Sequence, residues 1–274
     1  MKKILVPTDF SDHAYYALKV AAEIARKNDG EIFLLHMLEL PHEGSDALGS
    51  GKDIPEIMLF KNKAIQRLDD LMDDEVLDGL KVSELVQFEL AFDGIVKISK
   101  KNDIDLVVMG SHGASGYKEM FIGSNAEKVV RNSEVPVLII KKDYETFNVD
   151  HFVFASDFTP EAKSSFNKVV QFANEFNAHL HLLMVNTPSS FKPTHIARAN
   201  MAEFVGQFTI NNYSTHIYND VNVESGVLNF TKEINADLIG MSTHGRKGLS
   251  HFFNGSISED LVNHAHHPIV TFKI

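Results

Sequence analysis

The sequence contains no cysteine. The chain therefore forms no disulfide, has no thiolate nucleophile and offers no cysteine-ligated zinc or iron–sulfur site. Disulfides belong to oxidising compartments, so their absence fits the cytoplasmic location that we expect. No apolar run comes near the roughly 20 residues that span a bilayer, and we expect no membrane partner.

Basic residues are also scarce. Lys and Arg number 26 against 37 Asp and Glu, which leaves a formal net charge of -11. A surface for nucleic acid needs a positive patch, and the sequence has no dense Lys/Arg block, so we expect no nucleic-acid partner. With 44% apolar and 23% charged residues, the 274-residue chain has the composition of a globular protein long enough for two domains.

Two parts of the chain repeat each other. Residues 3–41 align without a gap with the segment that begins at His151, and the segment from Asp103 parallels the segment from Asn235. A repeat of this length indicates a duplicated structural unit. We therefore expect two domains, residues 1–145 and 146–274, with the polar segment 141–150 as the connector.

Short apolar runs alternate with amphipathic helical patterns in each repeat. In the first repeat they predict strands at 4–6, 32–36, 85–90, 106–109 and 137–140, and helices at 12–27, 56–78, 94–102 and 124–132. Ser11 and Thr159 stand where the first helix of each repeat needs an N-cap. Near-continuous apolar strands separated by helices predict an α/β fold, with two tandem, doubly wound, five-stranded parallel-sheet domains.

Polar residues and glycines stand at the predicted ends of two strands. Asp9 follows the first strand, where its carboxylate can accept hydrogen bonds from a base or a ribose. The fourth strand runs into Gly110 and Gly113, and nine residues later Gly123 and Ser124 open a helix whose N-terminus suits phosphate. Each feature alone also fits an ordinary turn or helix cap. Together they predict a mononucleotide site at the carboxyl edge of the sheet.

These motifs resemble a known family. VPTDFS near the start, LLHMLE after the second strand, and GSHG followed by nine residues and GSN resemble the universal stress protein (UspA) family, in its ATP-binding subclass. The resemblance covers both repeats. It implies an adenine nucleotide alpha hydrolase-like fold, a regulatory or protective role in the stress response, and bound ATP or ADP with Mg2+ on the phosphates.

The resemblance also implies which residues contact the nucleotide. Pro7, Thr8, Asp9 and Met37 would hold adenine, and Met109, Gly110, Gly113, Gly123, Ser124 and Asn125 the ribose and phosphates. His112 lies inside the glycine loop, where nucleotide contact and turn stabilisation both stay open. Related single-domain proteins dimerise through their last strand, so we expect strands 137–140 and 269–272 to pair antiparallel in an intramolecular pseudo-dimer, with a homodimer as a further possibility.

The second repeat departs from the pattern. Ser242 stands where the first motif glycine would be, and its side chain either crowds the ribose or is accommodated. The motif positions Gly245, Gly255 and Ser256 are retained. The full set of second-repeat candidates is Ser156, Asp157, Val185, Ser242, Gly245, Gly255, Ser256 and Ile257. Whether this repeat binds nucleotide is left open.

Histidines raise two further questions. His264, His266 and His267 form a cluster that suits zinc or nickel but also fits a polar loop, and we assign no metal site to it. Weak ATP hydrolysis would need a base beside the phosphates, for which His112 is the natural candidate, and we assign no catalytic residue. A nucleotide-independent oligomeric scaffold is the remaining alternative. His179 and His181 alternate along a strand and should share one sheet face.

Overall fold

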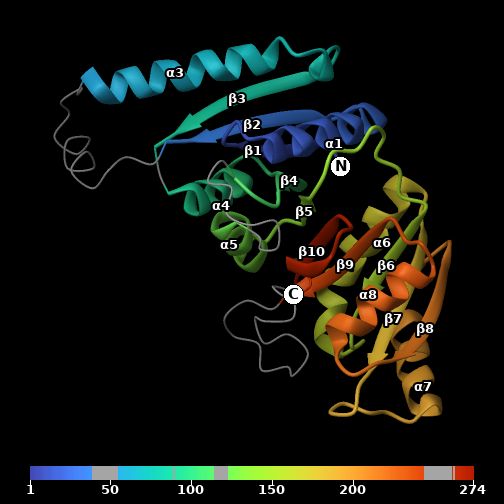
Figure 1. Ribbon diagram of the computed structural model, residues 1–274. Coiled ribbons are helices and arrows are strands. Elements are labelled where there is room, and N and C mark those ends of the chain that lie inside the picture. Colours follow the sequence, from blue (N-terminus) through green and yellow to red (C-terminus); the bar gives the residue numbers. More distant parts are fainter. Residues whose placement is uncertain (39–54, 89, 114–122, 244–260, 262) are drawn as a thin grey trace. The chain divides into compact units, whose positions relative to one another are not determined.

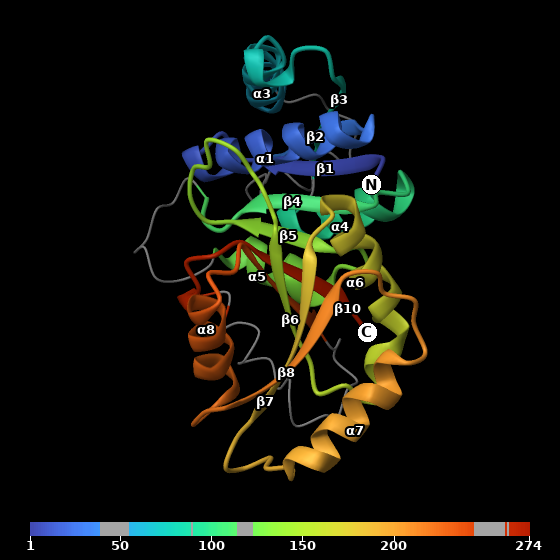
Figure 2. The same ribbon diagram turned by 90° about the vertical axis from the view of Figure 1, so that its right-hand side faces the viewer.

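Strands and helices alternate along the whole of the chain that is described. The computed structural model describes residues 1–38, 55–88, 90–113, 123–243, 261 and 263–274. It separates into two units (Figure 1), and the same elements are seen from a second side in Figure 2. Unit 1 includes residues 1–113, 123–129 and 140–146, and unit 2 includes 130–139 and 147–274.

Among the described residues, the five strands and four helices of the first repeat follow one another in the predicted order. Its bounds are β1 (Lys3–Thr8), α1 (Asp12–Asn28), β2 (Glu31–Met37), α3 (Pro55–Met72), a 3-10 turn (Glu75–Leu77), β3 (Lys81–Gln87), α4 (Ala91–Lys101), β4 (Leu106–Gly110), α5 (Ser124–Asn132) and β5 (Val137–Ile140). In unit 1 the strand order is β3-β2-β1-β4, and the pairs β2–β3, β1–β2 and β1–β4 are parallel. The order reverses at β1, which is the switch point of a doubly wound sheet.

Two predicted elements of the first repeat have wrong bounds. The strand expected at 85–90 runs from Lys81 to Gln87, because its first half pairs with β2 although it is rich in polar residues. Leu90 lies beyond it and is 64% exposed. The helix expected at 56–78 ends at Met72, and the Asp74 carboxylate then accepts a hydrogen bond from the Val76 N–H to start a separate 3-10 turn.

The described strands and first three helices of the second repeat follow the same order, but its 3-10 turn comes after the first strand. Its bounds are β6 (His151–Ala155), a 3-10 turn (Pro160–Ala162), α6 (Lys163–Phe176), β7 (His179–Asn186), α7 (Thr194–Val205), β8 (Tyr213–Asn219), α8 (Val223–Glu233), β9 (Leu238–Thr243) and β10 (Ile269–Lys273). In unit 2 the strand order is β5-β10-β9-β6-β7-β8. All of these neighbours are parallel except β5 and β10.

The predicted antiparallel pairing of the two last strands is confirmed. Ile139 lies opposite Ile269, and Val137 lies opposite Thr271. All four residues are at most 2% exposed. Each repeat would otherwise end on an unpaired apolar strand edge, which is prone to pair with another chain. Within unit 2, β5 and β10 pair with each other, so each covers the other's apolar edge.

Helices cover both faces of the sheet in unit 2. Phe154 of β6 packs on Phe166 of α6, with ring centroids 5.8 Å apart. On the opposite face, His216 of β8 packs on Phe230 of α8 at 4.7 Å. In unit 1, α1 packs on β1 and β4. The predicted α/β architecture is therefore confirmed, and the strand ends are left as the places where a ligand can approach.

Only one of the two predicted N-caps holds. The Ser11 side chain accepts a hydrogen bond from the Ala14 N–H at the start of α1. Thr159 makes no such bond, because Pro160 opens a 3-10 turn and α6 begins only at Lys163. The first helix therefore starts differently in the two repeats.

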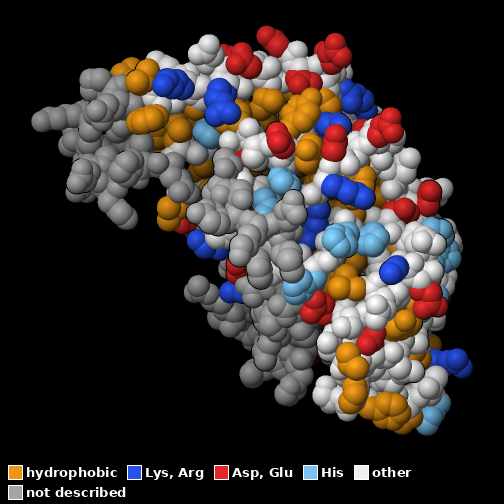
Figure 3. Space-filling view, viewed as in Figure 1, with side chains coloured by type: hydrophobic (Ala, Val, Ile, Leu, Met, Phe, Trp, Pro, Cys, Tyr) orange, Lys and Arg blue, Asp and Glu red, His pale blue; other side chains and the backbone are white. Residues whose placement is uncertain are grey.

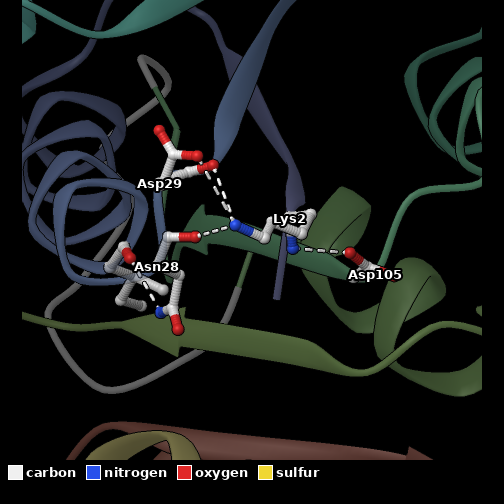
Figure 4. A network of polar contacts seen from close by, with 5 residues as sticks. Lys2, Asn28, Asp29 and Asp105 are labelled. Atoms are coloured by element: carbon white, nitrogen blue, oxygen red, sulfur yellow. Dashed lines mark hydrogen bonds and ion pairs between the residues drawn. The ribbon is translucent and has the colours of Figure 1, made fainter.

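Backbone details repeat along with the elements. The left-handed region, which favours glycine, is occupied by three matched pairs of other residues: Phe10 and Phe158, Asp29 and Asn177, and Asp103 and Asn235. Asp105 and its counterpart Asp237 each accept hydrogen bonds from two main-chain N–H groups at the start of the first strand of their repeat. Figure 4 shows Lys2 joining Asp105 to the carbonyl groups at the end of α1.

Candidate functional site

A cavity of about 400 Å³ opens in unit 1 at the carboxyl ends of β1, β2 and β4. It lies beside the switch point of the sheet, where open α/β folds bind ligands. All eleven residues that the sequence singled out in the first repeat line it: Pro7, Thr8, Asp9, Met37, Met109, Gly110, His112, Gly113, Gly123, Ser124 and Asn125. Segments as far apart as β1 and the start of α5 therefore meet at one place.

The turn after β1 holds Asp9 in a fixed position. Asp9 Oδ1 accepts hydrogen bonds from Ser11 N–H at 3.1 Å and from Ser11 Oγ at 2.6 Å. Thr8 Oγ1 accepts one from the N–H of Phe10, whose φ is 63°. Asp9 thus braces the turn, as the simpler interpretation of the sequence expected. Its side chain is nevertheless exposed and lines the cavity, so it is also available to a ligand.

The three motif glycines differ in how much room their surroundings leave for a side chain. A Cβ on Gly110 would lie 2.6 Å from the His13 carbonyl oxygen, and one on Gly113 would lie 2.5 Å from Asp9 Oδ2. Gly110 is therefore required by the main chain of His13, whereas a side chain at position 113 would only have to displace the end of the Asp9 side chain. A Cβ on Gly123 would meet nothing closer than 3.5 Å, and Gly123 is not among the described glycines with positive φ. Nothing in the described chain requires glycine at position 123.

The start of α5 faces the cavity. Gly123 N–H donates to Ser111 O at 2.7 Å, and the Glu127 N–H makes the first turn of the helix by donating to Gly123 O. The N–H groups of Ser124, Asn125 and Ala126 have no partner within the helix, as in the first turn of any α-helix. All three residues line the cavity. This wall therefore presents N–H donors and a partial positive charge, which suit phosphate.

The sequence missed the apolar wall of the cavity. Leu35 of β2 and Ala91 and Ile95 of α4 line it together with Ala14, Ser111 and Ala126. The spacing of Ala91 and Ile95 is a helical signal, but the sequence predicted a start of α4 beyond Ala91. A cavity lined both by apolar side chains and by N–H donors suits a base attached to a phosphate.

Two histidines lie beside the glycine loop. The Ser111 side chain is within 2.9 Å of His112 Nδ1, and the His112 ring lies 5.1 Å from that of His13 on α1. His112 lines the cavity and also supports the turn, so both of its expected roles are open to it.

The comparison with known proteins decides the family. The model of the universal stress protein family matches residues 1–141 and again residues 148–273. The chain belongs to the universal stress protein family. A universal stress protein of Synechocystis is 24% identical over 294 residues and covers 100% of both chains. One of Methanocaldococcus jannaschii is 34% identical over 154 residues, which cover 52% of this chain and 95% of that protein.

A solved structure supports the same assignment. The crystal structure of a universal stress protein from Archaeoglobus fulgidus matches with a TM-score of 0.74 at 26% identity, covering 99% of this chain and 96% of that chain. The two repeats are thus two universal stress protein domains in tandem, as the sequence predicted.

The four described candidates of the second universal stress protein domain are buried. Ser156, Asp157, Val185 and Ser242 are 3%, 8%, 2% and 1% exposed. The Ser242 Oγ lies 3.4 Å from the Oγ of Ser165 on α6. The other candidates of this domain, Gly245, Gly255, Ser256 and Ile257, lie outside the described residues.

The remaining histidine candidates, His264, His266 and His267, lie within the described residues. His264 Nδ1 lies 2.5 Å from Glu224 Oε1 of α8. The two side chains form an ion pair when the imidazole is protonated. In the part of the chain that the structure describes, no three His, Asp or Glu side chains are arranged to hold a metal ion. None of the described helices combines the length and the apolar character needed to cross a membrane.

Proposed function

We propose that the first universal stress protein domain binds an adenine nucleotide, ATP or ADP, in the cavity at the ends of β1 and β4. The base would lie against the apolar wall near Met37 and Ile95, and the phosphates against the start of α5, with Mg2+ on the phosphates. The protein would act in the cytoplasm as a regulatory or protective stress-response factor.

The observation that carries the proposal is the free space beside the backbone of Gly123. A Cβ on Gly110 would collide with the main chain of His13, whereas a Cβ on Gly123 would meet nothing closer than 3.5 Å, and Gly123 has no positive φ. Gly123 borders the cavity directly before the N–H groups of α5. The space beside the Gly123 backbone is therefore open to the cavity, and it suits a ligand whose phosphates come close to the backbone.

The test uses Gly123→Val in the full chain. We expect the variant to fold and to lose at least a hundredfold in affinity for Mg2+-ATP, because the β-branched side chain occupies the space of the phosphates. Glycine is a better N-cap residue than valine, so the substitution should lower the free energy of unfolding by only about 1 kcal/mol. Calorimetric titration with ATP, with circular dichroism as the check of folding, measures both. Undiminished ATP binding by the folded variant would refute the phosphate site.

The duplication supplies a matched control. Asp9→Asn and Asp157→Asn change equivalent residues in the two domains. Asp9 lines the cavity, whereas Asp157 is 8% exposed. We expect Asp9→Asn to weaken ATP binding and Asp157→Asn to leave it unchanged. Measuring phosphate release in the same samples, with His112→Gln beside the unchanged chain, separates simple binding from weak hydrolysis.

A further inference from the structure

Four histidines from three strands of unit 2 form one connected group. His151 begins β6, His179 and His181 lie on β7, and His216 lies on β8. The register places His151 beside His179 and places Ser214 beside His181, so all five side chains share one face of the sheet. We call these four imidazoles and Ser214 the histidine cluster. Figure 3 shows histidine side chains gathered at the right-hand edge of unit 2, in the region of β7 and β8.

The imidazoles bond directly to one another. His151 Nδ1 lies 3.0 Å from His181 Nε2, and His181 Nδ1 lies 3.2 Å from His216 Nε2. Each such contact needs one ring nitrogen with a proton and one without. The chain of three histidines is therefore satisfied when the rings are neutral.

The cluster is arranged around a hydroxyl rather than around a metal position. Ser214 Oγ lies 2.9 Å from His179 Nε2, 3.2 Å from His181 Nδ1 and 2.7 Å from His216 Nε2. These nitrogens converge on an oxygen atom at hydrogen-bond distances, longer than the roughly 2.0–2.1 Å of a zinc–imidazole bond. Among the described residues no such group fits a metal ion.

The centre of the cluster is covered by α8. His181 is 8% exposed, and Phe230 of α8 lies over His216 at 4.7 Å and near His181 at 6.4 Å between ring centroids. Burial first, and then the neighbouring histidines, lower the pKa of His181 to about 4. Burial and His179 also lower the pKa of His216.

The nearby acidic and phenolic groups are engaged elsewhere. Asp237, before β9, accepts hydrogen bonds from the main-chain N–H groups of Asp150 and His151. At the other end of β8, Asp220 accepts from Asn229 of α8, and Glu233 of α8 acts on the Tyr218 hydroxyl. The charged groups that act on His181 are the other three histidines of the cluster.

We propose that the histidine cluster is an acid-sensitive latch, in which protonation breaks the contacts between imidazoles and loosens α8 and β8 from the sheet of unit 2. A first proton on His181 places a charge in a buried site. A second proton leaves two N–H groups facing each other across about 3 Å, together with two like charges.

The direction of the pH effect follows from linkage. Well above pH 6.5, His181 and His216 are neutral in both the closed and the open state, and the latch is at full strength. As the pH falls from 6.5 toward 4, His181 binds a proton in the open state but stays neutral in the closed state. For one histidine that stays neutral when closed, the opening equilibrium should rise about thirtyfold between pH 7.5 and pH 5.0.

Hydrogen exchange of the full chain, at pH 7.5 and pH 5.0 in the presence of EDTA, tests the proposal. After correction for the intrinsic exchange rate, we expect at least a tenfold loss of protection at pH 5.0 in peptides from α8 and β8. Peptides from β1 and β4 of unit 1 serve as the internal reference. His181→Gln with His216→Gln should abolish the pH dependence, whereas His195→Gln, which changes an exposed histidine on α7, should leave it unchanged.

A second measurement covers the case in which the double variant does not fold. The pKa values of the four imidazoles, read by NMR titration of the unchanged chain, should be lowest for His181. The proposal is overturned if His181 titrates near pH 6.5 or above, or if α8 and β8 lose no more protection than β1 and β4 do. It is also overturned if the folded double variant keeps the full pH dependence.

Discussion

The two domains share one fold but differ in the residues that fill it. Where the first domain has Ile4, Leu18 and Ile24, the second has Phe152, Phe166 and Phe172 at the matching positions. All six are at most 3% exposed. The first domain keeps an open cavity at its strand ends, whereas the matching residues of the second are buried. The two copies thus share a scaffold but differ in the aromatic content of the core and in the exposure of the matching strand-end residues.

The largest effect is expected from the aromatic core of the second domain. Phe166 packs on Phe154 and on Phe204, whose ring centroids lie 5.8 and 4.9 Å away. Phe166→Ala should lower the stability of unit 2 by about 3–5 kcal/mol. Hydrogen exchange resolved by peptide measures this loss separately for the two units. An equal loss of protection in β1 and β4 would contradict the separate cores that the comparison assumes.

A reciprocal exchange sharpens the contrast between Gly110 and Ser242. Gly110→Ser should cost about 1–3 kcal/mol, because its Cβ would collide with the main chain of His13. Ser242→Gly should cost only about 0.5–1 kcal/mol, through the greater freedom of glycine in a strand. Urea unfolding, followed by probes in each unit, compares the two. Equal losses of stability in the two variants would show that α1 packs on β4 as closely as α6 packs on β9.

A smaller effect distinguishes Lys141, which follows β5, from Lys273, the last residue of β10. Burial lowers the pKa of Lys141 to about 8, whereas Lys273 Nζ lies 3.4 and 3.3 Å from the carbonyl oxygens of Arg131 and Asn132 at the end of α5. As the pH rises from 8 to 10.5, the unfolded chain holds a proton that the folded Lys141 has lost. Stability should therefore rise by up to about 1.4 kcal/mol per pH unit, and Lys141→Met should remove this rise.

The matched control for this experiment is Lys273→Met. It should leave the alkaline rise in place and cost about 0.3–1 kcal/mol, through lost interaction with the end of α5. Thermal unfolding between pH 7.5 and pH 10.5 reads out both variants. A rise that persists in Lys141→Met contradicts the assignment to that residue.

Sequence alone predicted what depends on local pattern and on the repeat. Asp9, Gly110 and Gly123 were recognised because the carboxyl ends of parallel strands meet at one edge of the sheet, whatever the details of packing. The antiparallel partnership of Val137–Ile140 with Ile269–Lys273 followed from the resemblance and from the need to cover two apolar edges.

What the sequence did not reveal depends on contacts between distant residues. The start of β3 at Lys81 was missed because pairing with β2, rather than apolar character, makes it a strand. The direction of Ser242 depends on the packing of α6. His179 and His181 were assigned to one face, but His151 and His216 join them only through the register of β6, β7 and β8, which no local pattern encodes.

The central claim is that the first domain alone supplies the nucleotide site, and the stoichiometry of binding tests it most directly. The full chain, freed of nucleotide, is titrated with Mg2+-ATP by calorimetry beside the Gly123→Val variant. The account predicts one high-affinity site per chain, which disappears in the variant. Two equivalent sites per chain, or a site that survives in folded Gly123→Val, would contradict it.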